Sequence, residues 1–208
     1  TALTYKSGDA FLSAAKLRSN QLAVFLDSTG RAYSLPAHTL PSARGQGEPL
    51  TGRLEPPSGA SFVAVLGGEP DDRWLLASDA GYGFICTLSD LFAKPRGGKA
   101  VLTLPAAAEV LPPVPVAGSD ADLVVAATNR GHLLAFPATE LPQLARGKGN
   151  KIVGIPSAKA RLREELVVTI AVLPKGASVK VRSGKRALTL KPDDLERYVG
   201  ERGRRGSL

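Results

Sequence analysis

The sequence has few of the residue types that catalytic and metal sites need. Its 208 residues include one cysteine, two histidines, no methionine and only 5% aromatic residues. A single cysteine can form no internal disulfide, and there is no paired His/Cys spacing of the zinc-binding kind. Cys86 stands in the apolar run "GFICTL" and is expected to be a small buried hydrophobe. Without a nucleophile–base constellation, the chain is not expected to be an enzyme.

Long hydrophobic runs are also missing. There is no stretch of about 18 uncharged apolar residues, and the start, "TALTYKSGDAF", lacks the order of a signal peptide. We therefore expect a cytoplasmic protein with no membrane partner. Because the chain does not begin with methionine, Thr1 is not expected to be the natural start. The 43% of hydrophobic residues is enough to build a substantial core.

An internal repeat organises the chain. Three segments share an apolar run, a polar turn ending in glycine, and a second apolar run. They are "LAVFLDSTGRAYSL" from Leu22, "WLLASDAGYGFICTL" from Trp74 and "LVVAATNRGHLLAF" from Leu123, with turn glycines Gly30, Gly81 and Gly131. Each is predicted to be a β-hairpin, since glycine allows the positive φ of a tight turn. A fourth, more basic hairpin, "ASVKVRSGKRALTL", turns at Gly184.

A basic loop follows each hairpin after a predicted short helical turn. The loops read "ARGQG", "KPRGGK", "ARGKGNK" and "GERGRRG", and a further strand is predicted after the first three, in "PLTGRL", "AVLTL" and "KIVGI". Residues 1–20 resemble the end of a unit whose hairpin lies upstream. Short strands at this spacing, without a long amphipathic helix, predict an all-β, propeller-like ring of small sheets. The expected units are 1–20 (partial), 21–57, 58–107, 108–157 and 158–208, in one domain.

The basic loops do not have the sequence of a nucleotide-binding P-loop. That motif needs a hydroxyl residue directly after its lysine, whereas Lys99 precedes Ala100 and Lys148 precedes Gly149. Isolated Arg-Gly pairs can be solvated turns. Recurrence at matching positions of a ring would instead place the charges along an arc that a DNA duplex could follow. Arginine grips phosphate oxygens, and an adjacent glycine lets the backbone approach.

Charge is unevenly distributed along the chain. From Gln143 to the end there are 16 Lys/Arg and 6 Asp/Glu, whereas the first 142 residues carry 11 and 13. The predicted DNA-binding residues are Arg44, Arg53, Lys94, Arg96, Lys99, Arg146, Lys148, Lys151, Arg182, Lys185, Arg186, Arg202, Arg204 and Arg205. Those in the basic part, Arg146, Lys148, Lys151, Lys185 and Arg186, are expected to contribute more affinity than Arg44 and Arg53. Tyr33, Tyr82 and Phe84 are expected in the core rather than as stacking platforms for bases.

Several of these runs resemble one known family. "FLDSTGRAYSLPAHTLPSARGQGEPLTG", "ASDAGYGF", "LPQLARGKGNKI" and "VGERGRRG" are similar to the C-terminal DNA-binding domains of bacterial type IIA topoisomerase A subunits, and the topoisomerase IV branch is the closer one. The resemblance covers essentially the whole chain. It implies a β-pinwheel of about five small four-stranded blades, open or broken, with the first blade truncated.

The resemblance also implies a function and partners. The expected role is non-sequence-specific binding and bending of duplex DNA, which positions it for decatenation and relaxation of supercoils. Gyrase carries a box of the type Q-R-R-G-G-R-G, whereas the nearest copies here are "QLARGKG" and "KPRGGK", and the first-unit loop "LTYKSGD" has no arginine. Full gyrase-type wrapping is therefore not expected.

Implied partners are the catalytic core to which such a domain is joined and the ATPase subunit of a nucleoid-associated heterotetramer, which uses magnesium and ATP. The fragment itself is expected to be a monomer without a cofactor. The alternatives are a gyrase-type wrapping domain, a protein-binding propeller scaffold and a propeller hydrolase.

Overall fold

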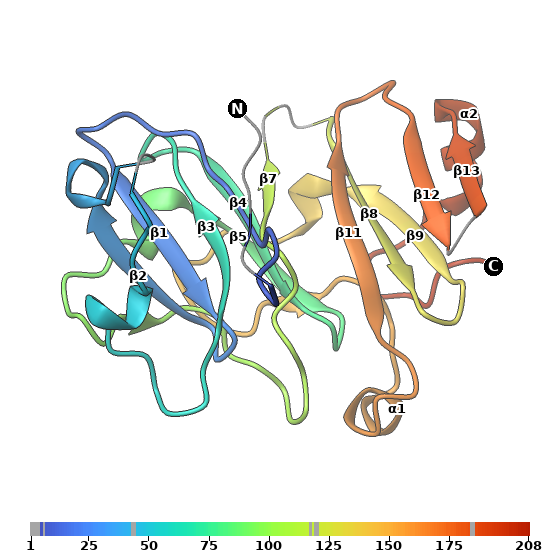
Figure 1. The fold of residues 1–208 in the computed structure, drawn as a ribbon. Coiled ribbons are helices and arrows are strands. Elements are labelled where there is room, and N and C mark those ends of the chain that lie inside the picture. Colours follow the sequence, from blue (N-terminus) through green and yellow to red (C-terminus); the bar gives the residue numbers. More distant parts are fainter. Residues whose placement is uncertain (1–4, 6, 43–44, 117, 119–120, 184–185) are drawn as a thin grey trace.

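A computed structural model describes residues 5, 7–42, 45–116, 118, 121–183 and 186–208. Short strands form four small antiparallel sheets that follow one another across the molecule (Figure 1). The first sheet has the order β3 (Phe62–Leu66), β1 (Leu22–Asp27), β2 (Arg31–Pro36), β6 (Lys99–Ala100). The second has the order β10 (Asn150–Lys151), β5 (Tyr82–Thr87), β4 (Arg73–Ser78), β7 (Val114–Val116). The third is β11 (Val167–Leu173), β8 (Leu123–Thr128), β9 (Leu133–Pro137), and the fourth is β12 (Val179–Ser183) with β13 (Arg186–Leu190).

The four predicted hairpins are confirmed as β1–β2, β4–β5, β8–β9 and β12–β13. In the first, the register runs from Leu22 opposite Pro36 to Leu26 opposite Ala32. Gly30, Gly81 and Gly131 have φ of +83°, +84° and +86°, the left-handed conformation that glycine adopts without strain. Gly184 lies outside the described residues.

The side chains of each strand point alternately to the two faces of its sheet, and those that face a neighbouring sheet form a hydrophobic core with it. Val24 and Leu26 pack with Leu76 and Phe84 of the second sheet, while Phe25, between them in sequence, points to the outer face of the first. The same division recurs in the third sheet. Val124 and Ala126 face the second sheet and Val125 faces the fourth. Because side chains alternate in a strand, one strand serves two cores, and the sheets pack face to face as blades.

The blades exchange strands at the basic loops. β6 follows the second hairpin in sequence but pairs with β2 of the first, and β10 follows the third hairpin but pairs with β5 of the second. In the third sheet, Ser207 exchanges two backbone hydrogen bonds with Leu133, at 2.8 and 2.9 Å. Each of the first three sheets therefore gains an edge strand or bridge from the basic loop that follows the next hairpin along the chain.

A glycine stands at each of these crossings. Gly98, Gly149 and Gly206 have φ of +63°, +77° and +83°. A Cβ on any of them would overlap a backbone carbonyl of the earlier hairpin with which the loop pairs, namely that of Ala32, Gly83 or Leu133. The loops thus need glycine for close backbone approach as well as for conformation.

Two parts of the strand prediction need correction. "PLTGRL" is not a strand but a 3-10 turn at Leu50–Gly52, because it has no earlier hairpin to pair with in the described residues. Instead Leu54 is buried beside Phe25 and Tyr33, and the Glu55 amide donates to the Arg96 carbonyl. The predicted partial unit at 1–20 contributes no strand among its described residues.

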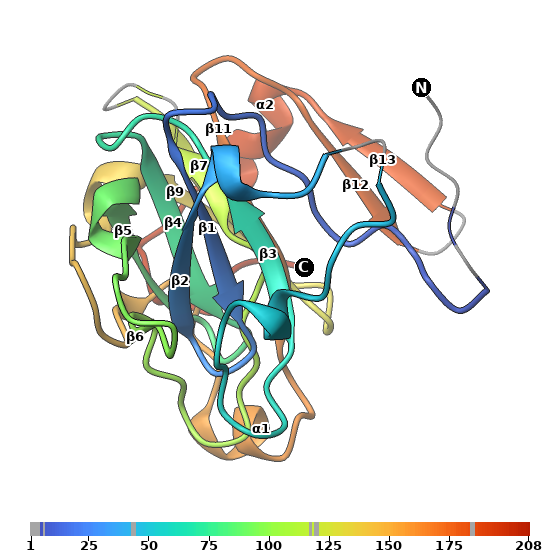
Figure 2. The same cartoon turned by 60° about the vertical axis from the view of Figure 1, so that its left-hand side comes forward.

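Short helical turns follow the hairpins, as expected, at Ala37–Thr39, Leu88–Leu91, Ala138–Glu140 and α2 (Pro192–Leu195). The one further α-helix of the described residues, α1 (Ser157–Arg161), lies at one end of the molecule, beneath the sheets in both ribbon views (Figures 1 and 2). The prediction that Cys86 is buried is confirmed, with 2% of its surface exposed.

The crossing glycines give a direct test of strand exchange. Gly149→Ala should lower the free energy of unfolding by about 1–2 kcal/mol for the left-handed backbone and by a further 1–3 kcal/mol for the overlap with Gly83. Gly176→Ala is the matched control, since Gly176 also has a positive φ, +81°, but has open space around its Cα. Denaturant unfolding of both variants makes the comparison. Equal destabilisation would contradict the close crossing.

Candidate nucleic-acid interface

The four basic loops touch one another in sequence order. We call them loop 1 (45–55), loop 2 (94–99), loop 3 (145–151) and loop 4 (200–206), and together the loop band. Arg96 of loop 2 donates from Nε to the Arg53 carbonyl of loop 1 at 2.9 Å. The Gly147 amide of loop 3 donates to the carbonyl of Val101, just after loop 2, at 2.9 Å. Arg202 of loop 4 donates to the Lys151 carbonyl of loop 3 at 2.7 Å. The loops therefore form one continuous band across the blades.

Several predicted DNA-binding arginines hold this band together. Besides the contacts of Arg96 and Arg202, Arg53 donates to Thr39 and pairs with Glu48 at 3.2 Å. Arg96 also lies 3.4 Å from Glu55, and Arg204 lies 2.9 Å from Glu201. A guanidinium already paired with protein oxygens has fewer donors left for phosphate. These residues position the loops at least as much as they add charge to the surface.

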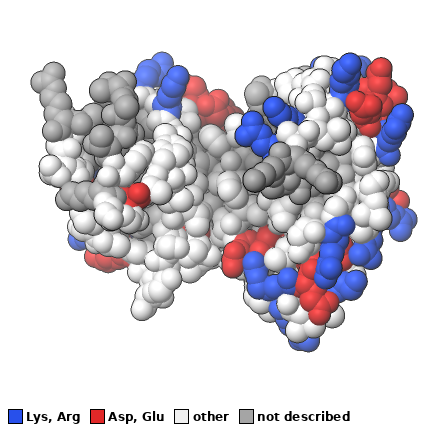
Figure 3. Space-filling view, turned by 45° about the vertical axis from the view of Figure 1, so that its right-hand side comes forward, with Lys and Arg blue, Asp and Glu red and all other residues white. Residues whose placement is uncertain are grey.

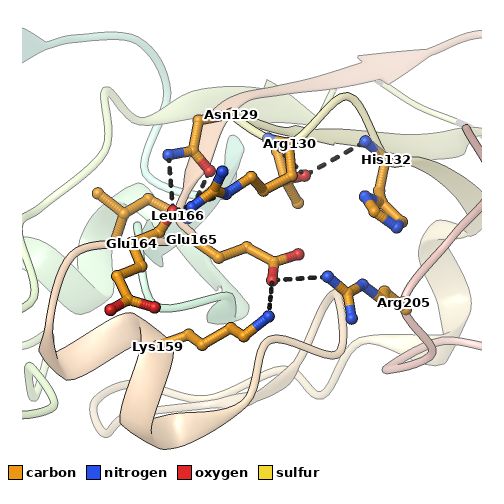
Figure 4. Close-up of polar contacts among 9 residues, drawn as sticks. Asn129, Arg130, His132, Lys159, Glu164, Glu165, Leu166 and Arg205 are labelled. Atoms are coloured by element: carbon orange, nitrogen blue, oxygen red, sulfur yellow. Dashed lines mark hydrogen bonds and ion pairs between the residues drawn. The ribbon is translucent and has the colours of Figure 1, made fainter.

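Arg205 is committed to a buried carboxylate (Figure 4). Glu165 is fully buried, and its Oε2 accepts a hydrogen bond from Arg205 at 2.9 Å and lies 4.0 Å from Nζ of Lys159. The neighbouring segment is held to the third hairpin, where Arg130 donates to the Glu164 carbonyl at 3.0 Å. A buried carboxylate needs such a partner, so Arg205 anchors loop 4 to the third blade.

A second group of predicted residues has no hydrogen-bond or ion-pair partner among the described residues. They are Lys94, Lys99, Arg146, Lys148, Lys151 and Arg182, of which all but the half-buried Lys99 are exposed. Arg44 and Lys185 lie outside the described residues. Arg186 is in β13, and its side chain is not described. The cations able to take up phosphate thus include members of loop 2, loop 3 and the fourth hairpin.

The expectation of a core position is confirmed for Tyr33 and Phe84, which are fully buried, whereas Tyr82 packs against the core but is only partly buried. Tyr82 is half-buried, and Nζ of Lys148 lies 4.4 Å above the centre of its ring. Lys151 approaches the same ring to 6.0 Å. Cation–π attraction holds such lysines over the ring face. The sequence places Tyr82 directly after the turn glycine Gly81, and this position at a strand end is a signal of partial exposure.

The space-filling view agrees with the uneven charge of the sequence. In Figure 3, the lobe that carries the third and fourth sheets and α1 shows most of the lysine and arginine, with acids between them, while the other lobe shows fewer charged side chains among its described residues on this face.

The described residues offer little for catalysis. Burial raises the pKa of the Cys86 thiol to about 12, with a further contribution from Asp90, so the thiol is a poor nucleophile at neutral pH. Burial and a hydrogen bond to Asp27 raise the pKa of Tyr33 to about 12. In the described part of the chain, no group of three His, Cys, Asp or Glu side chains could hold a metal ion. No helix there is long and apolar enough to cross a bilayer.

Four face-to-face sheets that exchange strands through a band of basic loops define a β-pinwheel. The family model described as DNA gyrase C-terminal domain, beta-propeller, matches residues 72–113 and 122–174. The solved structure of the E. coli ParC C-terminal domain has a TM-score of 0.92 and 51% identity, and the match covers 99% of this chain and 83% of that one. The DNA gyrase A C-terminal domain, with a TM-score of 0.70 and 14% identity, shares the fold.

Curated relatives agree with the structural match. The A subunit of DNA topoisomerase 4 from Pseudomonas aeruginosa is 58% identical over 205 residues, and that from Escherichia coli K12 is 51% identical over 206. The chain belongs to the family of C-terminal domains of topoisomerase IV A subunits, which confirms the predicted family and the all-β pinwheel fold. The match covers 99% of this chain and 27% of the length of these relatives.

The division between anchoring and free arginines predicts opposite effects of alanine substitution on stability. Arg205→Ala leaves the buried Glu165 with Lys159 as its one cationic partner among the described residues, and should lower the free energy of unfolding by about 3 kcal/mol. Arg146→Ala removes an exposed side chain without a partner and should change it by less than about 0.5 kcal/mol. Chemical denaturation of both variants checks this, and similar losses would show that Arg205 is not an anchor.

Proposed function

We propose that the chain is a DNA-binding domain that holds and bends duplex DNA along the loop band without reading its sequence. The observation that carries the proposal is the set of exposed, unpaired cations in consecutive loops that contact one another. Support also comes from the relatives, which are A subunits of DNA topoisomerase 4. Backbone amides and cations can contact phosphates, whereas the loops offer no arrangement for reading base edges.

In this proposal the domain serves strand passage within a larger enzyme. It would act in the cytoplasm on nucleoid DNA, as a single unit over residues 1–208, next to a catalytic core in the same polypeptide and to a separate ATPase subunit. Holding a duplex near that core would favour decatenation and relaxation of supercoils.

We also propose that the DNA bends without a complete wrap. Bending 20–30 base pairs by 40–90° costs on the order of 1–6 kcal/mol, which contacts along the whole arc must offset. At the loop 1 end, Arg53 and Arg96 are engaged by Glu48 and Glu55 and by backbone carbonyls. Among its described residues, loop 1 therefore has no unpaired cation to hold a duplex.

Binding should depend steeply on salt and not on sequence. If about six phosphates are neutralised, log K should fall with log salt at a slope of roughly −5. Fluorescence anisotropy with several unrelated duplexes, titrated at a series of salt concentrations, measures both properties. A flat salt response, or strong preference for one duplex, would count against phosphate-dominated binding.

The incomplete wrap makes a prediction for DNA topology. Circular plasmid relaxed in the presence of this chain and then freed of protein should show little change in linking number, because the free end of the arc holds the duplex too weakly to trap a turn. A gyrase-type domain assayed in parallel is the positive control. A large positive shift, proportional to the amount of this chain, would contradict the proposal and favour gyrase-type wrapping.

A further inference from the structure

A small cavity opens beside loop 3, between the start of β5, the 105–107 turn and α1. It has a volume of about 210 Å³, and its lining includes Tyr82, Pro105, Ala106, Lys148, Ala160 and Arg161. This is smaller than the roughly 300–1,000 Å³ of pockets for drug-sized ligands. Its size therefore favours a small group rather than a whole nucleoside.

Two cations from different parts of the chain line the cavity. Lys148 belongs to loop 3 and lies 4.4 Å above the Tyr82 ring, whereas Arg161 is the last residue of α1. Both side chains are exposed, and neither has a hydrogen-bond or ion-pair partner among the described residues. The Tyr82 ring restricts Lys148 to one side of the opening. Two unpaired cations over a partly apolar floor favour a singly charged anion with two free oxygens.

The walls are fixed by strained backbone. Among the described residues, the non-glycine residues with positive φ are Ala107, at 61°, and Arg163, at 57°. Ala107 directly follows one cavity wall, and Arg163 lies two residues after Arg161. The two are joined, since Arg163 donates to the Ala107 carbonyl at 2.6 Å.

The same guanidinium is anchored on the other side. It contacts the carboxylate of Asp79, which is almost fully buried, at 2.9 Å and that of Glu109 at 3.3 Å. Left-handed non-glycine residues cost of order 1–3 kcal/mol each and persist where surrounding structure holds them. Here the strain and the Arg163 contacts hold α1 and the 105–107 turn at a fixed separation across the cavity.

We infer that this cavity is a seat for one phosphodiester of the DNA backbone, held between Lys148 and Arg161. The seat rests on the proposed DNA-binding function and extends the loop band onto α1, a segment that sequence patterns did not include among the DNA-binding residues. Lys148 supplies a point charge and Arg161 a planar fork, so the phosphate is held by two kinds of donor. Because both cations serve one phosphate, loss of either should remove most of the seat.

The test compares Lys148→Ala, Arg161→Ala and the double variant with wild type in salt-titrated binding to a random-sequence duplex. Each single variant should lower the salt slope by about 1 and weaken binding about eightfold at 0.1 M salt. The factor follows because one phosphate contact changes log K by roughly 0.9 when the salt concentration changes tenfold, here from 1 M to 0.1 M. The double variant should be no more than about twofold weaker than either single one, because the two sites are coupled. Thermal unfolding should be nearly unchanged.

Two control variants separate the seat from general charge. Lys16→Ala removes an exposed lysine outside the loop band with the same change of charge, and should weaken binding less than about twofold. Arg161→Lys keeps the charge and should retain most of the slope. The seat is overturned if Lys148→Ala and Arg161→Ala weaken DNA binding no more than Lys16→Ala does. It is also overturned if the two losses of affinity multiply in the double variant, or if Arg161→Lys loses as much affinity as Arg161→Ala.

Wild type and a change of anion complete the design. If wild type binds duplex DNA with the expected salt slope but the variants give one of the contradicting results above, only the seat is refuted. If wild type does not bind duplex DNA at all, the proposed function is refuted as well. Replacing chloride by inorganic phosphate at constant ionic strength should weaken DNA binding by wild type more than by Arg161→Ala, because only wild type keeps the seat for which the free anion competes. Equal weakening of the two would show that the cavity does not hold phosphate and would overturn the seat.

Discussion

The close crossing of backbone at the basic loops is the constraint on which the rest of the structure depends. Each of the first three sheets receives an edge strand or bridge from a loop further along the chain, and at each crossing a glycine in left-handed conformation lies against the hairpin of the sheet that it joins. This arrangement fixes the order and spacing of the blades. It also fixes where the basic residues beside those glycines reach the surface. Fold and charge pattern therefore have the same origin.

The Arg-Gly loops consequently have two roles. One group of arginines, represented by Arg96, Arg202 and Arg205, donates to neighbouring loops or to the buried Glu165, and so keeps the band in shape. A second group, represented by Arg146 and Lys148, has no ion-pair partner among the described residues. Only cations of the second kind can contribute their full charge to a phosphate backbone. Counting basic residues overstates the DNA-binding capacity of such a domain.

Much of the fold could be predicted from the sequence because its determinants are local. Alternating apolar residues and turn glycines such as Gly30 and Gly81 specify the hairpins, and recurrence of the hairpin specifies a ring. The strand exchange could not be predicted, because "AVLTL" and "KIVGI" do not indicate which hairpin they pair with. "PLTGRL" has a similar pattern and yet forms a 3-10 turn, since it lacks a partner among the described residues.

The candidate site was less predictable than the fold, because the charge available to a ligand depends on which basic side chains already have a partner within the protein. Arg205 and Arg146 both stand beside glycine or another basic residue, but only Arg205 reaches a buried carboxylate, Glu165, 40 positions away. Likewise, Arg161 lines the same cavity as Lys148 only because of where α1 packs. Such contacts between distant segments leave no mark in a single sequence.

The central claim, that the loop band is the DNA-binding surface, is tested most directly by lysine footprinting. The chain is acetylated with and without an excess of duplex DNA, and modification at each lysine is read by mass spectrometry. We expect DNA to protect Lys94, Lys148 and Lys151 from acetylation and to leave Lys16 and Lys175 reactive. Protection of Lys16 and Lys175 with undiminished modification of the loop lysines would contradict it.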